Sequence, residues 1–423
     1  MRFPSLSDLD REQRRIYGEA PGDGAIIVVG PPGTGKTVMA FHRAQKVKQL
    51  GQKPQVIMFN KVLRRYTSTR ADVAPGVPVK TMNNWVEGWW RGGTKSRVPK
   101  ANASHWDIDW TTIAAEGIAK VSASANGELS WGHLLIDEGQ DFPPEMYMAI
   151  GMIQSQLAKK QVATQVTIFA DDNQRLQAHK NSRIVDIRKN LFIDGVAERN
   201  YVLRKNFRNT RPIARFAAHF QVGNESGIAE LPDAEGEIPR VLFAANDRDI
   251  ADFIARKTKM SPGKQVGVIV HGRQGDVRRA YNQVKCRLPS DRSAPRLQMY
   301  LSGDKTHTDD ALDFDSGNTI TFLHVQSAKG LEFDIVFFVG MEGMNLDSSG
   351  FYNERMALYV MCSRARSELY LAFDDIDPSS PLPASAALLP RPSSGLCKFV
   401  GLGSLDKDMD RIEKQLASNR DYQ

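Results

Sequence analysis

One segment near the N-terminus has the residue types and spacing of a phosphate-binding loop. It reads Gly30-Pro31-Pro32-Gly33-Thr34-Gly35-Lys36-Thr37 and follows the apolar run Ala25–Val29. Glycines let backbone N–H groups curl around phosphate oxygens, a lysine reaches the terminal phosphates, and a hydroxyl can ligate Mg²⁺. The segment therefore predicts a nucleoside triphosphate site. Its expected binding residues are Gly30, Pro31, Gly33, Thr34, Gly35, Lys36 and Thr37.

An acidic pair after a second apolar run turns nucleotide binding into an expectation of hydrolysis. The run His133–Ile136 ends directly in Asp137 and Glu138. A carboxylate at a strand end can hold Mg²⁺, and its neighbour can orient water for in-line attack on a γ-phosphate. We therefore expect Asp137 to bind the metal with Thr37, and Glu138 to act as the base. Without the phosphate loop, the pair would be typical of a solvated turn.

The composition is that of a globular protein with more than one domain. The chain has 423 residues, of which 41% are hydrophobic and 25% are charged. This length allows two or three domains with substantial cores. No apolar stretch approaches the length of a membrane span, and the N-terminus lacks an apolar signal segment. These features predict a cytoplasmic protein without a membrane partner.

Charge and cysteine content add little to the motifs. The net charge of +7 is a small excess of 56 basic over 49 acidic side chains, so it is compatible with a polyanionic partner without requiring one. Three cysteines are too few for a disulfide framework or a four-ligand zinc site. Mg²⁺ is therefore the only metal that the sequence implies.

Strand-like and helical runs alternate along most of the chain. This rhythm is typical of parallel sheets covered by helices, and it occurs in two series. The sequence therefore predicts an α/β fold with two domains. The expected strands are 25–29, 55–59, 134–136 and 166–170 in the first series, and 241–244, 266–270, 296–300, 319–324 and 334–339 in the second.

The composition changes near the C-terminus. Five prolines occur among serines and alanines between residues 378 and 392, which predicts an extended linker. Weak helical periodicity over 405–418 could mark a segment that docks on the body or binds a partner, although disorder is favoured. We therefore expect residues 376–423 to form a Pro/Ser-rich linker and a C-terminal tail.

Several further segments, in a fixed order over residues of about 5–373, resemble the motifs of superfamily 1 DNA helicases of the UvrD/Rep-like branch. Asp137–Asp141 resembles the family's Asp-Glu-Ala-Gln-Asp signature, with Gly139 in place of alanine. Gln326–Asp334 resembles its fifth motif and Tyr359–Arg366 its sixth. The resemblance implies two RecA-like domains, 1–203 and 204–375, with ATP and Mg²⁺ in the cleft between them.

The resemblance also implies roles for residues outside the phosphate loop. Gln13 matches a glutamine that reads the adenine edge, and a side-chain amide can pair with adenine's donor and acceptor together. Phe207 matches an aromatic residue that stacks on the base, and Glu332 a glutamate associated with the nucleotide sugar. Arg208 and Arg364 match arginines that reach the γ-phosphate.

Gln174 matches the glutamine of the third motif, which in the family senses the γ-phosphate. The tryptophan that follows it in the family is replaced here by Gln177-Ala178-His179, and the histidine of the fifth motif is replaced by Gln326. The tryptophans at positions 85, 89 and 90 could stack on bases, but packing under the first domain is favoured. The expected nucleic-acid contacts are Phe59, Asn60, Lys61, Thr81, Trp85, His179, Ser327 and Lys329.

The sequence thus predicts an ATP-dependent, single-stranded-DNA-stimulated helicase or translocase, with the 3′ to 5′ polarity of the branch that it resembles. Its expected substrates are single-stranded DNA or single/double-strand junctions. The chain is short for the family and resembles a core-only form without large accessory subdomains. Two alternatives stay open. One is an ATP- and nucleic-acid-gated module that regulates a partner such as a nuclease or loader, and the other is an RNA-directed motor.

Overall fold

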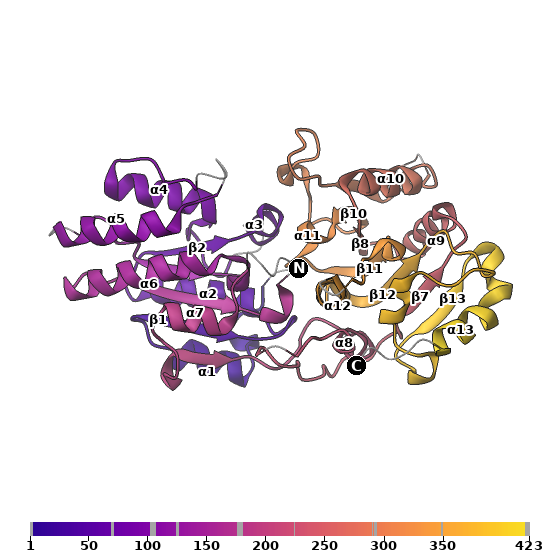
Figure 1. Ribbon diagram of the computed structural model, residues 1–423, viewed down its shortest axis with the longest axis horizontal. Coiled ribbons are helices and arrows are strands. Elements are labelled where there is room, and N and C mark those ends of the chain that lie inside the picture. Colours follow the sequence, from indigo (N-terminus) through magenta and orange to yellow (C-terminus); the bar gives the residue numbers. More distant parts are fainter. Residues whose placement is uncertain are drawn as a thin grey trace. The chain divides into compact units, whose positions relative to one another are not determined.

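The computed structural model divides the chain into two compact units (Figure 1). The first comprises Met1–Arg204 and Asn224–Ala229, and the second comprises Lys205–Gly223 and Glu230–Gln423. The residues that the structure describes are 3–68, 72–101, 107–123, 127–175, 181–223, 225–289, 291, 294–347 and 350–418.

The first unit contains a parallel six-stranded sheet in the order β3-β2-β4-β5-β1-β6. Every residue of β1, β4 and β5 is buried, as expected for strands covered on both faces. The strands are β1 (Ala25–Val29), β2 (Pro54–Met58), β3 (Val79–Thr81), β4 (His133–Ile136), β5 (Gln165–Ala170) and β6 (Asn200–Val202).

Helices cover both faces of this sheet. Ile26 and Val28 of β1 pack in one core with residues of α1 and α2, whereas Ile27 and Val29 pack in another with α4, α5, α6 and α7. This alternation is the two-residue period of a strand. The helices are α1 (Arg11–Glu19), α2 (Lys36–Gln49), α3 (Lys61–Ser68), α4 (Met82–Thr94), α5 (Trp110–Ala123), α6 (Pro144–Lys159) and α7 (Ile184–Asn190).

The second unit contains a parallel seven-stranded sheet in the order β13-β7-β12-β11-β8-β10-β9. The strands are β7 (Arg240–Phe243), β8 (Gln265–Val270), β9 (Arg296–Met299), β10 (Thr319–His324), β11 (Phe333–Val339), β12 (Ala365–Phe373) and β13 (Lys398–Gly401). The helices are α8 (Arg211–Ala218), α9 (Asp247–Lys259), α10 (Gln274–Lys285), α11 (Val325–Ala328), α12 (Gly350–Cys362) and α13 (Met409–Ser418). The predicted α/β class with two helix-covered parallel sheets is confirmed.

The segment after Phe373 differs from the expected linker and tail. Strand β13 pairs with β7 and forms an edge of the second sheet. Helix α13 buries Ile412 and Leu416, and Leu405 before it is also buried. The expectation for residues 376–423 is therefore corrected, because up to Ser418 this segment belongs to the core of the second unit. The prediction was wrong because a proline-rich composition is typical of linkers, and because β13, an edge strand of four residues, is too short to show a clear hydrophobic periodicity.

The tryptophans of α4 are packing residues. Trp85 and Trp90 are fully buried, and the Trp85 ring stacks on Trp89 with centroids 5.2 Å apart. The Trp131 ring meets Trp89 edge to face, with centroids 5.8 Å apart. The favoured packing role is confirmed. The expectation that Trp85 contacts nucleic acid is corrected, because a fully buried ring offers no face to a base.

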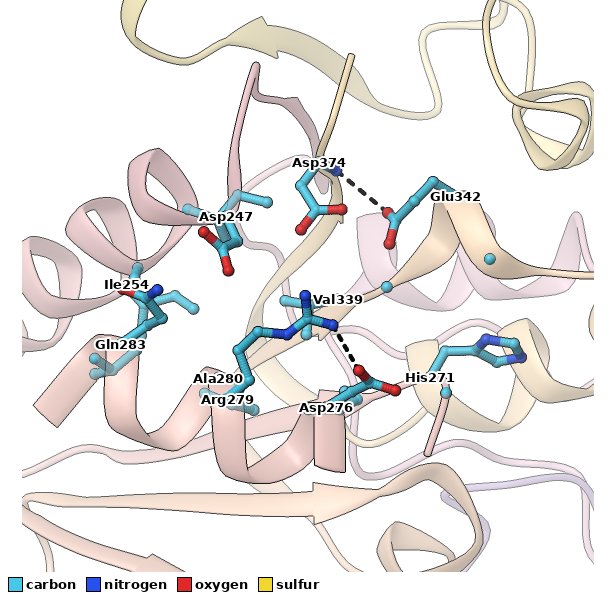
Figure 2. Close-up of a pocket in the computed structure, with 18 residues that line it drawn as sticks. Asp247, Ile254, His271, Asp276, Arg279, Ala280, Gln283, Val339, Glu342 and Asp374 are labelled. Atoms are coloured by element: carbon cyan, nitrogen blue, oxygen red, sulfur yellow. Dashed lines mark hydrogen bonds and ion pairs between the residues drawn. The ribbon is translucent and has the colours of Figure 1, made fainter. Parts of the chain in front are cut away.

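A cavity of about 200 Å³ lies in the second unit beside the carboxyl ends of β8 and β11 (Figure 2). Apolar side chains of α9 and α10 form part of its wall, and Arg279 reaches into it from α10 and pairs with Asp276 at 2.6 Å. Asp247, Glu342 and Asp374 also line it. Burial, together with the adjacent Asp374 carboxyl group, raises the pKa of Glu342 to about 8.

This shifted pKa predicts a pH-dependent stability that Glu342→Gln removes. Unfolded Glu342 ionises near its ordinary value, whereas the folded residue keeps its proton up to about pH 8. The stability contributed by the protonated form is therefore complete below about pH 4 and is lost as the pH rises through 8. Relative to the wild type, Glu342→Gln should gain about 1 kcal/mol or more between pH 5 and pH 9, measured by thermal melting.

The matched control is Asp406→Asn, because Asp406 is an exposed acid of the same unit that does not line the cavity. This variant should track the wild-type pH curve. Parallel curves for Glu342→Gln and the wild type would contradict the prediction.

Candidate functional site

The phosphate-binding loop joins β1 to α2. Gly35 caps α2 with φ +84°, a left-handed conformation that favours glycine, so the helix begins at Lys36 with its N–H groups at the loop. The Lys36 ammonium donates to the carbonyls of Gly30 at 2.6 Å and Pro31 at 3.1 Å. Thr34 Oγ1 donates to the Pro31 carbonyl at 2.9 Å. The carbonyl oxygens of the loop therefore accept hydrogen bonds from the Lys36 ammonium, as the oxygens of a bound phosphate would.

Gln13 reaches this loop from α1, although it lies 17 positions before Gly30 in the sequence. Its Oε1 accepts from the backbone N–H of Asp10, and its Nε2 donates to the Thr34 carbonyl at 3.1 Å. The side chain is 5% exposed. The structure thus brings Gln13 to the predicted nucleotide loop, and the reading of adenine stays a prediction.

The expected metal ligands lie together. The Thr37 hydroxyl donates to Asp137 Oδ2 at 2.8 Å, which joins the start of α2 to the end of β4. Asp137 is fully buried, and its Oδ1 has no hydrogen-bond partner among the residues that the structure describes. Burial and the adjacent Glu138 carboxylate raise the pKa of Asp137 to about 7, against the lowering effect of Thr37 and Lys36. A hydroxyl beside an uncompensated buried carboxylate fits Mg²⁺, which prefers oxygen ligands.

Glu138 is held next to this pair by an unusual backbone and by Gln140. Its φ is 53°, a left-handed conformation that costs a non-glycine residue about 1–2 kcal/mol. Gln140 Nε2 donates to Glu138 Oε2 at 2.6 Å, and Gln140 Oε1 accepts from the backbone N–H of Asp171 at 2.9 Å. Gln140 therefore connects the expected base to the end of β5.

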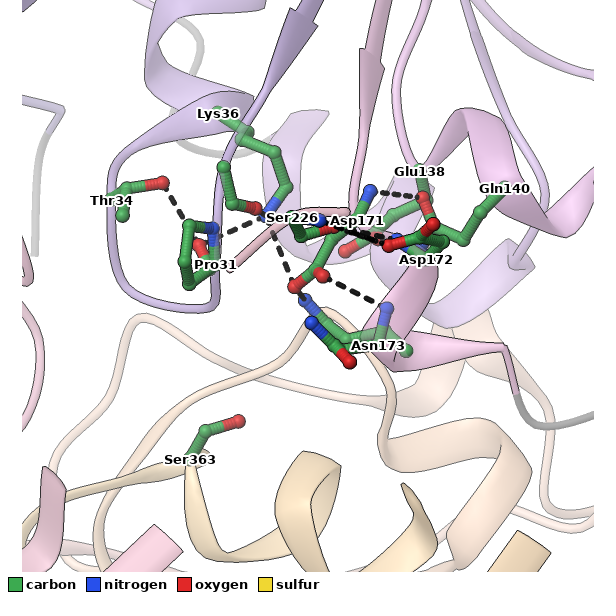
Figure 3. A network of polar contacts seen from close by, with 12 residues as sticks. Pro31, Thr34, Lys36, Glu138, Gln140, Asp171, Asp172, Asn173, Ser226 and Ser363 are labelled. Carbon is green, nitrogen blue, oxygen red and sulfur yellow. Dashed lines mark hydrogen bonds and ion pairs between the residues drawn. The ribbon is translucent and has the colours of Figure 1, made fainter. Parts of the chain in front are cut away.

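Asp171 is the centre of a buried polar network (Figure 3). Its carboxylate lies 3.8 Å from the Lys36 ammonium and accepts from Gln174 Nε2 at 2.6 Å. Burial raises the pKa of Asp171, and the Lys36 charge and the Gln174 amide oppose this rise. Gln174, which is predicted to sense the γ-phosphate, and Lys36, which is predicted to bind it, thus both interact with the Asp171 carboxylate.

Sequence reasoning gave no role to Asp171 or Gln140. Both could have been considered, because each comes after a buried strand and lies close in sequence to a residue that was predicted to act in the site. A fully apolar strand that ends in an acidic or amide side chain is the signal that could have found them. The contact between Lys36 and Asp171 could not be predicted from the sequence, because the two residues are far apart in the chain.

The second unit carries its own cluster of predicted residues. Arg208 Nε donates to Glu332 Oε2 at 2.7 Å, and Arg208 Nη1 donates to the Ser363 carbonyl at 3.4 Å. Arg366 lies 3.8 Å from Glu332 and 3.1 Å from Asp334. Glu332 therefore faces two arginines, of which Arg366 was missed by the sequence analysis. The prediction that Glu332 is associated with a nucleotide sugar stays untested.

Arg364 and Phe207 have contrasting environments in this unit. Arg364 is 1% exposed, and its Nε donates to the Val360 carbonyl at 2.9 Å at the end of α12. Phe207 is half exposed, with the Lys205 ammonium 5.6 Å from its ring centroid. The Phe207 ring is therefore accessible to solvent, whereas Arg364 is held by carbonyls within the fold.

Four predicted nucleic-acid contacts lie at the carboxyl ends of the neighbouring parallel strands β2 and β3: three follow β2, and Thr81 is the last residue of β3. Phe59 is 47% exposed and its ring meets Phe142 edge to face. Asn60 Oδ1 accepts from the backbone N–H of Val62 at the start of α3, and Lys61 is exposed. Thr81 caps α4 by accepting from the backbone N–H of Asn84 at 3.5 Å.

The remaining candidates are less accessible or undetermined. Ser327 and Lys329, in and just after α11, are buried. His179 lies outside the described residues. Phe59 and Lys61 are thus exposed members of the predicted nucleic-acid contacts, and their contact with nucleic acid stays a prediction.

Two family models match the chain in agreement with this geometry. A model of the AAA domain matches residues 13–180, which include Gln13, the phosphate loop and the acidic pair. A model of the UvrD-like helicase C-terminal domain matches residues 319–372, which include Glu332, Arg364 and Arg366. Together, these two domain matches support a UvrD-like helicase of superfamily 1. The matches support a DNA helicase type of function, with a nucleotide-binding domain within residues 13–180.

Comparison with individual proteins adds little to this assignment. One solved structure that matches this chain is the C-terminal domain of a possible DNA helicase from Lactobacillus plantarum WCFS1. The two are 20% identical with a TM-score of 0.31, and the match covers 46% of this chain and 98% of that one. A search of curated proteins found no match. Across the described parts of the chain, no helix has the length and apolar character that a membrane span needs.

Gly35→Ala should weaken nucleotide binding. An added Cβ would lie 2.6 Å from Gln13 Nε2, and φ +84° is strained for alanine. Displacement of Gln13 and loss of the loop conformation together should lower the affinity for Mg·ATP by about tenfold, measured by titration with a fluorescent ATP analogue.

Gly51→Ala is the matched control, because Gly51 has φ +79° but no atom within 4 Å of the added Cβ. It should be strained to a similar degree without a change in nucleotide affinity. Equal affinities of both variants and the wild type would contradict the role assigned to the crowded loop.

Proposed function

We propose that this chain couples Mg²⁺-dependent ATP hydrolysis to movement along single-stranded DNA with 3′ to 5′ polarity. The observation that carries the proposal is the 2.8 Å hydrogen bond between Thr37 and Asp137, with Glu138 adjacent. It joins a phosphate-binding loop to an acidic pair, which is the arrangement that metal-assisted phosphoryl transfer needs.

The predicted site residues of the first unit have separate roles in this proposal. Lys36 binds the terminal phosphates, Thr37 and Asp137 hold Mg²⁺, and Glu138 orients the attacking water. A bound Mg²⁺ ion would neutralise charge on the phosphate oxygens. The short distance from Lys36 to Asp171 supports a role for Gln174 in sensing whether a γ-phosphate is present.

The second unit supplies cations in this proposal. Arg208 and Arg364 would stabilise the charge that develops on the transferred phosphoryl group. Arg208 is bound to Glu332 here, so it must exchange one carboxylate oxygen for phosphate oxygens during the reaction. Exposed Phe59 and Lys61 would contact the DNA strand, one by stacking and the other through phosphate.

The test is the ATP hydrolysis rate with and without a single-stranded DNA oligonucleotide, at low and moderate salt. DNA should raise the rate of the wild-type chain, and Lys36→Ala and Glu138→Gln should each lower the stimulated rate by at least about a hundredfold, as expected for groups that act on the transferred phosphoryl. An exposed-lysine variant, Lys414→Ala, serves as the control and should match the wild type.

The outcome also separates the alternatives. Equal stimulation by an RNA oligonucleotide of the same sequence would indicate an RNA-directed or unselective motor. Hydrolysis that neither nucleic acid changes would contradict the proposal and would favour a module that regulates a protein partner.

A further inference from the structure

A short segment of the chain returns to the first unit between two parts of the second. The chain leaves the first unit after Arg204, comes back for Asn224–Ala229, and leaves again before Glu230. Ordering such a segment costs conformational entropy, so a compensating interaction is expected within it. That interaction is formed by Ser226.

Ser226 forms a three-bond clasp with Asp172, the residue that follows Asp171 (Figure 3). The Ser226 hydroxyl donates to Asp172 Oδ1 at 2.7 Å, and its oxygen accepts from the Asp172 backbone N–H at 2.9 Å. The Ser226 backbone N–H also donates to Asp172 Oδ1, at 3.2 Å. Both residues are at most 5% exposed. Buried hydrogen bonds to a carboxylate are among the stronger ones in proteins.

The clasp is continuous with the network around Lys36. Asp172 is the next residue after Asp171, which faces Lys36 and Gln174. Hydrogen bonding by Ser226 also lowers the pKa of Asp171, in opposition to the larger effect of burial. A change in what Lys36 binds would therefore alter the groups to which Ser226 is attached.

The other end of the segment is tied to the loop that carries Arg208. Glu230 pairs with Lys205 as a parallel bridge, and its carbonyl accepts from the Asn206 backbone N–H at 3.3 Å. Asn206 Oδ1 in turn accepts from the backbone N–H of Arg208 at 2.9 Å. Only four residues lead from Ser226 to Glu230, a chain that spans at most about 14 Å.

We infer that Ser226 is a positioning residue that transmits the state of the nucleotide loop, through Asp171 and Asp172, to the loop that carries Arg208. This inference rests on the proposed ATP hydrolysis and extends it, because it names the path between a phosphate-binding lysine and an arginine on separate units. Ser226 touches neither nucleotide nor metal in this scheme. Its hydroxyl fixes the short segment that joins the two loops.

Ser226→Ala tests the inference, because it removes two of the three bonds and leaves Lys36, Thr37 and Asp137 unchanged. The DNA-stimulated kcat should fall about tenfold, whereas the Kd for Mg·ATP should stay within about twofold. Ser226→Thr, which keeps the hydroxyl, should restore most of the stimulated rate. Asp172→Ala should lower kcat to a similar extent, and the double variant should be no slower than either single one.

The matched control is Glu225→Gln in the same segment. It breaks an exposed ion pair, Arg188 to Glu225 at 2.6 Å, without touching the clasp, so its stimulated rate should equal that of the wild type.

Wild-type rates for Ser226→Ala, or additive losses in the double variant, would overturn the inference. Equal losses of melting temperature, ATP affinity and kcat in both the alanine and threonine variants would assign the clasp a merely structural role, which also overturns it. A wild-type chain that DNA does not stimulate would instead refute the proposed function.

Discussion

The buried pairing of Lys36 with Asp171 is the interaction on which the rest of the first unit depends. Two opposite charges 3.8 Å apart, 6% and 0% exposed, are stable only while each keeps further polar partners. The Lys36 ammonium donates to the carbonyls of Gly30 and Pro31, and the Asp171 carboxylate accepts from the Gln174 amide and from the backbone N–H of Asn173. A nucleotide that takes the lysine must therefore change the partners of Asp171, which gives a physical reason for a sensor at the end of β5.

The arginines of the second unit are also paired with an acidic side chain. Glu332 pairs with Arg208 and faces Arg366, so the arginine proposed to act on phosphate already has a carboxylate partner. Such an arginine is pre-oriented, and its exchange from carboxylate to phosphate oxygens costs less than withdrawal from water. Each unit thus holds a basic side chain next to a buried or half-buried carboxylate: Lys36 next to Asp171, and Arg208 next to Glu332. The short stretch of chain from Ser226 to Glu230 leads from the first unit to the second.

Much of the fold was predictable from the sequence because fully buried parallel strands are continuous apolar runs. The runs 25–29 and 335–339 were readable for this reason, whereas Lys398–Gly401 is a four-residue edge strand that follows a proline-rich stretch and was not. The loop residues Lys36 and Thr37 followed from spacing. The contact between Asp172 and Ser226 spans 54 positions and depends on how the chain crosses between units, which no local pattern encodes.

The central claim is that Lys36 reports nucleotide occupancy to Asp171 and onward to Ser226. Hydrogen–deuterium exchange of the full chain with and without Mg²⁺ and a non-hydrolysable ATP analogue tests it most directly. The account predicts altered exchange at residues 171–174 and 225–229 as well as in the phosphate loop, and loss of all three changes in Lys36→Ala. Altered exchange in the loop of the wild type, with none at 171–174 or 225–229, would contradict it.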